Sequence, residues 1–174
     1  MQWRRFALAA FAAVAVFGCS ANNPDLATLE KSRTVWRDLA AMHDDTYSYE
    51  VSTSSFTGYQ TLTTLQFETG SATFRRFESA APQATGLPGT LEVQWEERGT
   101  EVGSHIGAPP PDTIDTLYDR CAHEVLAQDP NRNTIVLYLD EAGILKSCIY
   151  VPDNCADDCN MGVWLSHLMM GKTY

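Results

Sequence analysis

The chain has 174 residues, of which 44% are hydrophobic and 20% are charged, and its formal net charge at pH 7 is −10. This size suits one ordinary domain with its own core. An acidic surface argues against nucleic acid and against anionic lipid as partners. It favours solubility and does not name a ligand.

The first 18 residues have the pattern of an export signal. Residues 1–5 are short and basic, residues 6–18 are apolar without a charge, and a cysteine follows. Such a basic start, short apolar core and small residue before the cut predict a signal peptide. The apolar run is shorter than the roughly 20 residues that a spanning helix needs. Gly18-Cys19 resembles the lipobox of bacterial lipoproteins, in which the cysteine becomes the acylated N-terminus.

The resemblance implies lipid attachment at Cys19, followed by a short tether (19–24) and a single domain (25–174). Phe17 is bulkier than the residue usually found there, so ordinary cleavage after Ala21 and an uncleaved anchor are the alternatives. Several acyl chains hold a protein on a membrane durably, whereas one chain does so marginally. We therefore expect a lipid-anchored protein of the bacterial cell envelope. By the same resemblance Ser20 is no inner-membrane retention signal, which favours the periplasmic face of the outer membrane.

In chain order, the first predicted element is a helix over 25–43, because its apolar residues fall near helical spacing. Apolar and polar residues then alternate, which predicts four strands. Turns at Thr57-Gly58 and Gly70-Ser71 and a loop over 79–89 separate them. The four strands are expected at residues 46–51, 61–68, 72–78 and 91–96.

A second loop covers 99–112, and Asp112 or Thr113 can cap the helix that follows. An amphipathic stripe defines this helix, formed by Ile114, Leu117, Tyr118, Cys121 and Val125. Three further strands are expected at 134–139, 144–151 and 162–168. The order α-ββββ-α-βββ predicts an α+β fold, with an antiparallel β-sheet and two helices packed on one face.

Five cysteines are present, and lipidation of Cys19 would leave four. In an oxidising compartment, four thiols in a small domain most often form two disulfides. Cys121 lies on the buried stripe of the second helix and Cys148 on a strand that should pack beneath it, so we expect these two to pair. Cys155 and Cys159 would then close one short loop. The main rival joins Cys121 to Cys155 and Cys148 to Cys159.

Other clusters offer weaker hypotheses of chemistry. The last three cysteines and His167 have wide spacings, whereas zinc sites use tight ones. The Asp153–Asp158 loop has three carboxylates that could hold calcium, but it does not match an EF-hand. His43-Asp44-Asp45 is expected to end the first helix. Tryptophans 36, 95 and 164 are interpreted as core anchors, with an aromatic ligand cradle as the alternative. We assign no catalytic, metal-binding or cofactor-binding residue and expect no cofactor.

The chain resembles a group of small bacterial lipoproteins that share a domain of unknown function. The segments that carry the resemblance are Trp36 with 47–50, 113–119, 139–145 and 153–160. The family brings no known catalysis or ligand, so no functional residue is carried over. The element order is also loosely similar to PepSY domains and β-lactamase inhibitory proteins, an analogy of fold alone.

Together these features predict a non-enzymatic binding or interaction module, attached to the membrane through its lipid, for an envelope protein or ligand of unknown identity. One alternative is an inhibitor of an envelope hydrolase, which would present the loop over 79–89 or 99–112. A less favoured alternative is a metal-assisted enzyme, which would show a concave pocket with converging titratable groups.

Overall fold

The computed structural model describes residues 24–83, 89–156 and 159–172. The expected signal peptide and Cys19 lie outside these residues, as does all of the expected tether except its last residue. No helix among the described residues is long and apolar enough to cross a membrane.

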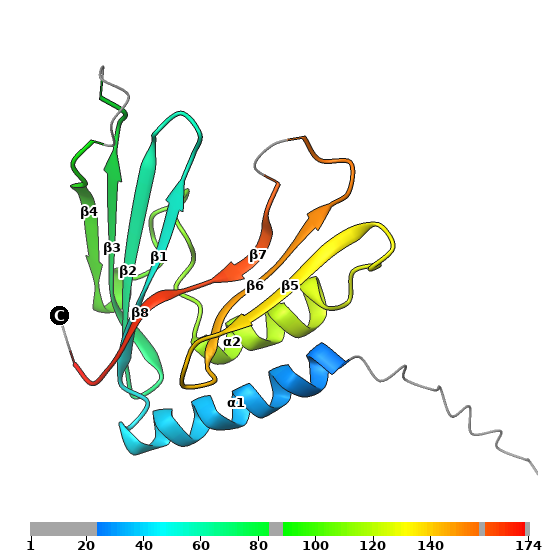
Figure 1. The fold of residues 1–174 in the computed structure, drawn as a ribbon. Helices are drawn as coiled ribbons and strands as arrows, with labels where there is room; N and C mark the ends of the chain where they lie inside the picture. Colours follow the sequence, from blue (N-terminus) through cyan, green and yellow to red (C-terminus); the bar gives the residue numbers. More distant parts are fainter. Residues whose placement is uncertain (1–23, 84–88, 157–158, 173–174) are drawn as a thin grey trace, which may run out of the picture.

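Within the described residues, two α-helices and two short helical turns alternate with eight strands (Figure 1). The elements are α1 (Pro24–Met42), β1 (Tyr47–Ser54), β2 (Gln60–Glu68), β3 (Ser71–Ala80), β4 (Glu92–Arg98), a 3-10 turn (Gly99–Glu101), α2 (Ile114–Arg120), a π-helical turn (Cys121–Val125), β5 (Asn133–Leu139), β6 (Leu145–Pro152), β7 (Met161–Trp164) and β8 (Ser166–Met170). The predicted α+β class and the order α-ββββ-α-βββ are confirmed.

All strand pairs are antiparallel, but they form two sheets where the sequence suggested one. A five-stranded sheet has the order β4-β3-β2-β1-β8, and a three-stranded sheet has the order β5-β6-β7. β7 pairs with β6 and β8 pairs with β1, although only Leu165 separates β7 from β8. The stretch predicted as one strand over 162–168 therefore belongs to both sheets (Figure 1).

The bend between β7 and β8 has local causes. Leu165 is buried and its N–H donates to the carbonyl of Lys146 at 2.9 Å, which ties the bend to β6. Two residues later, His167 has a positive φ of 48°. The β1–β8 register shifts between Ser48 and Glu50, and such an irregularity interrupts the alternation of side chains. A strict period of two predicts a strand here but not its division.

The main core lies between the sheets and the helices, which run along one side of the three-stranded sheet (Figure 1). Trp36 of α1 meets Tyr47 edge-on, and Tyr47 stacks on Phe67, both with ring centroids 4.8 Å apart. Tyr47, Tyr49 and Val51 are all buried, as the alternation in this strand predicts. Trp36 is therefore confirmed as a core anchor.

Helix α2 runs alongside α1 and contributes to the same core (Figure 1). Its N-terminus is capped by Thr113, whose side-chain oxygen accepts from the N–H of Thr116 at 3.1 Å. All five residues of the predicted apolar stripe are buried. The Tyr118 hydroxyl is bonded to Ser32 Oγ at 2.6 Å and accepts from the N–H of Leu145 at 3.0 Å, so it links both helices to β6. Burial raises the pKa of this phenol.

Candidate functional site

Both expected disulfides are present. Cys121 in the π-helical turn is bonded to Cys148 in β6, with the Cα atoms 5.6 Å apart. Cys155 is bonded to Cys159, with the Cα atoms 6.1 Å apart. The favoured pairing is therefore the one found, and the rival pairing is wrong. A disulfide sulfur is no thiolate ligand, so Cys148, Cys155 and Cys159 are not available to form a zinc site with His167.

The other candidate metal and acid–base residues do not converge. No group of three or more His, Cys, Asp or Glu side chains among the described residues could hold a metal ion. Asp157 and Asp158 of the calcium hypothesis lie outside the described residues. His43 follows the last residue of α1, and its N–H donates to the carbonyl of Ala40 at 3.0 Å, so the predicted helix end is in the right place.

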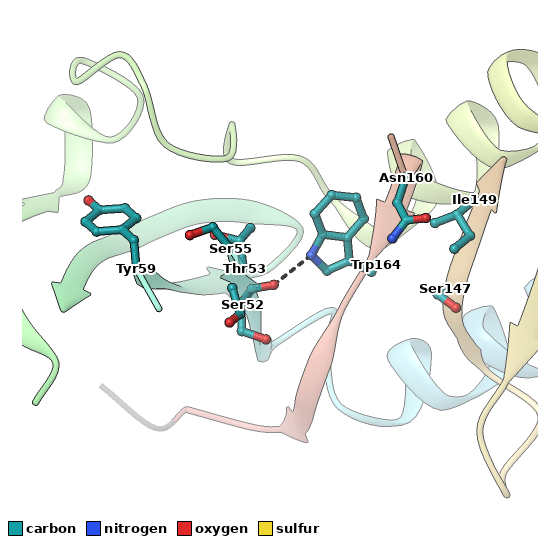
Figure 2. Close-up of a pocket in the computed structure, with 9 residues that line it drawn as sticks. Ser52, Thr53, Ser55, Tyr59, Ser147, Ile149, Asn160 and Trp164 are labelled. Carbon is teal, nitrogen blue, oxygen red and sulfur yellow. Dashed lines mark hydrogen bonds between the residues drawn. The ribbon is translucent and has the colours of Figure 1, made fainter. Parts of the chain in front are cut away.

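A cleft lies where the two sheets diverge. β8 pairs with β1 only up to Glu50, whereas β2 pairs with β1 as far as Ser54. Among the described strands, Val51–Ser54 therefore has a neighbour on one side only. On the N-terminal side of Leu165 the chain pairs with β6 as β7 and not with β1, and the cleft of about 450 Å³ lies between the sheets here (Figure 2).

The cleft is lined by uncharged side chains from both sheets. Its described lining residues are Ser52, Thr53, Ser54, Ser55, Tyr59, Ser147, Ile149, Asn160 and Trp164. Figure 2 shows Trp164 between the two walls, where its indole N–H donates to the carbonyl of Ser52 at 3.0 Å. Trp164 is partly buried, so it is a wall of the cleft as well as a neighbour of the core.

The register of β6 and β7 explains why Ser147, Ile149 and Trp164 face the cleft. Cys148 points to the helices, where it is bonded to Cys121, so Ser147 and Ile149 on either side point away from them. Trp164 and Gly162 lie opposite these two residues in β7. A Cβ at Gly162 would lie 2.2 Å from the carbonyl oxygen of Cys148, and its φ is +140°. Glycine is therefore needed for β7 to lie against β6.

A second polar site was not anticipated from the sequence. Tyr49, Leu65, Arg75 and Glu97 are in register across β1, β2, β3 and β4, so they share one face of the five-stranded sheet. Arg75 and Glu97 are both 1% exposed, and they form a two-point ion pair at 2.8 and 3.1 Å. The guanidinium also lies 4.8 Å from the ring centre of Trp95.

The loop after β4 covers this ion pair. Glu97 accepts from the N–H groups of Gly103 and His105, both at 2.6 Å, and from Ser104 Oγ at 3.0 Å. The Nδ1 atom of His105 lies 2.8 Å from the same carboxylate. Burial alone would raise the pKa of Glu97, but the donors from Gly103, His105 and Arg75 together lower the pKa well below its usual value.

This arrangement is an anchor for the loop rather than an acid–base pair. A carboxylate that accepts hydrogen bonds from backbone and from arginine is held in its ionised form, which suits binding and not proton transfer near neutral pH. His105 stacks on Trp95 with ring centroids 4.4 Å apart, and Trp95 stacks on Phe77 at 5.5 Å. Trp95 is therefore partly buried in a surface ring stack, and the prediction of a core anchor was wrong there.

Comparison with known proteins adds no further constraint. No family model, no curated protein and no solved structure matches this chain.

Proposed function

We propose that the chain is a lipid-anchored lipoprotein of the bacterial envelope whose domain binds a ligand without transforming it, in the cleft between the two sheets. The N-terminal pattern ending in Gly18-Cys19 supports the anchor. The observation that carries the binding role is the uncharged lining of the cleft. General acid–base catalysis needs positioned titratable groups, and the described lining offers a tyrosine as its one such group.

The chemistry of the lining favours an uncharged ligand that is rich in hydroxyl groups. Serine and threonine hydroxyls both donate and accept hydrogen bonds, and the amide of Asn160 does the same. Tyr59, at the β1–β2 turn, and Trp164, in β7, add flat aromatic surface to the cleft, which suits a ligand with an apolar face and polar edges. A saccharide ring has both features, so we propose an uncharged saccharide as the ligand class.

Calorimetric titration of the purified mature protein with chitotriose, cellotriose and maltotriose tests the ligand class. We expect saturable binding of at least one of these sugars. Tyr59→Ala and Trp164→Ala should weaken that binding at least tenfold. Phe56→Ala is the matched control, because Phe56 is exposed in the same β1–β2 turn but does not line the cleft. No heat of binding with any sugar, or equal losses in all three variants, would overturn the saccharide proposal.

The anchor is tested separately. Mass spectrometry of the mature protein should find an acylated N-terminal cysteine at position 19, and Cys19→Ala should release the protein from the membrane or block its processing. An unmodified N-terminus at Asn22 would contradict the anchor and leave the cleft proposal standing.

A further inference from the structure

The loop over Gly103–Pro109, between β4 and α2, presents one apolar side chain to solvent. Ile106 is 96% exposed, the highest value among the exposed large apolar residues described. A single exposed apolar residue on a surface is ordinary. The unusual feature is how firmly the backbone on both sides of it is held.

The ion pair beneath the loop holds both flanks of Ile106. On the N-terminal side, Glu97 accepts from the N–H groups of Gly103 and His105. Arg75 donates to the carbonyl of His105 at 2.7 Å and to the carbonyl of Pro109 at 3.1 Å, so it spans the tip. Ile106 is therefore one of only three residues (106–108) between two carbonyl groups that the Arg75 guanidinium holds in place.

A buried ion pair is a weak source of stability, because desolvation of two charges offsets their attraction. Here the remaining donors and acceptors of the pair are directed to the loop, so the pair specifies the loop's shape. A loop that is already rigid loses little conformational entropy when it binds, and this favours affinity. Apolar anchors that enter a pocket dominate the energetics of protein interfaces.

We infer that the Gly103–Pro109 loop is a preformed recognition element whose Ile106 side chain enters an apolar pocket of a partner protein. A lipid surface is a poorer fit, since one side chain buries little area and the chain carries a net charge of −10. The same charge favours a partner with a neutral or basic surface around its pocket. This inference is independent of the cleft and of its ligand.

Site-specific photocrosslinking of the full chain in its native cells tests this surface. A benzophenone amino acid replaces Ile106, and in a matched control it replaces Glu141, which is also exposed, in the β5–β6 turn. We expect one discrete adduct from position 106 and none from position 141. Glu97→Gln, which weakens the hold on the loop, should reduce the adduct at least tenfold.

A second arm keeps residue 106 natural and places the crosslinker at Glu101, which is exposed in the 3-10 turn that precedes the loop. Ile106→Asp should reduce the adduct at least tenfold, whereas Ile106→Leu should retain it. No adduct from position 106, equal adducts from positions 106 and 141, or adducts that ignore Glu97→Gln and Ile106→Asp would overturn the inference. Melting curves of each variant confirm that the domain stays folded.

Discussion

One face of the five-stranded sheet is covered in two contrasting ways. At β1 and β2 the row contains Tyr49 and Leu65, and apolar side chains of the helices complete a core that a disulfide links to β6. At β3 and β4 the same row continues as Arg75 and Glu97, and a loop completes it with hydrogen bonds.

The contrast shows what each kind of contact specifies. Apolar packing depends on volume and burial and tolerates changes of similar shape. Hydrogen bonds to a buried charge depend on direction and distance, so each one fixes a backbone position. The helix-covered part is therefore expected to carry most of the stability, and the loop-covered part to carry a defined surface shape.

The largest effect should come from separating the ion pair. Glu97→Ala leaves Arg75 buried without its counter-charge, and we expect a loss of about 3–5 kcal/mol of unfolding free energy. Urea denaturation followed by circular dichroism measures this loss. The double variant Arg75→Met with Glu97→Leu should recover most of the stability while releasing the loop, as shown by faster amide hydrogen exchange at His105. If the double variant is as unstable as the single one, the pair stabilises the fold directly.

Removal of the disulfide under α2 should rank next. The bond joins residues 27 apart in the sequence, so Cys121→Ala with Cys148→Ala should destabilise by roughly 3.5 kcal/mol, through a less restricted unfolded chain. The Cys155–Cys159 bond spans four positions, and its removal should lower the melting temperature less. Calorimetry of both double variants compares them. A larger drop from the second pair would reverse the expected ranking.

A smaller effect is expected from the hydroxyl that joins the helices to β6. Tyr118→Phe leaves the N–H of Leu145 and the hydroxyl of Ser32 without this partner, which should cost about 1–3 kcal/mol. Tyr138→Phe, at an exposed residue of β5, is the matched control and should be neutral. Equal stability of the two variants would show that water replaces the buried bonds.

The contribution of Glu97 to the free energy of unfolding should decrease in acid. Its pKa is lowered in the folded protein, so its stabilisation is fully present above the unfolded value of about 4.3 and is lost as pH falls toward the folded value. The stability difference between the natural protein and Glu97→Gln should therefore shrink as pH falls below about 4. Parallel urea titrations at pH 7 and pH 3 measure it. A constant difference would mean that the carboxylate is not held in its ionised form.

The smallest effect on stability is expected at the tip of the loop. Because Ile106 is exposed, Ile106→Asp should change the unfolding free energy by less than about 0.5 kcal/mol. Thermal denaturation tests this. A clear loss would show that Ile106 packs against the domain and is not available to a partner.

The helices and most strands could be predicted from the sequence because their apolar periods are regular. The stripe from Ile114 to Val125 and the alternation from Tyr47 to Val51 are examples. The pairing of Cys121 with Cys148 followed from the same patterns. The π-helical turn and the division at Leu165 could not be predicted, since neither changes the apolar pattern.

The two candidate sites depend on contacts between distant segments, which a pattern of neighbours does not contain. In β4 the expected alternation of Val93 with Trp95 is interrupted by a register shift in the β3–β4 pair. Val93 is half exposed, whereas the buried residue in phase with Trp95 is Glu97. A charged residue in phase with apolar ones in each of two successive strands is the signal that could have indicated the Arg75–Glu97 pair. Nothing local connects Ser52 with Trp164.

The direct passage from β7 in one sheet to β8 in the other restricts where residues can be inserted or deleted during evolution. Insertions in the turns of β1–β2 or β5–β6 add residues at the surface and are readily accommodated. One residue added or removed beside Leu165 would turn every following side chain to the opposite face. Either Trp164 would leave the cleft or Leu168 and Met170 would leave the core. Homologues that keep both are therefore expected to vary freely in their turns and to keep a constant spacing between Trp164 and Met170.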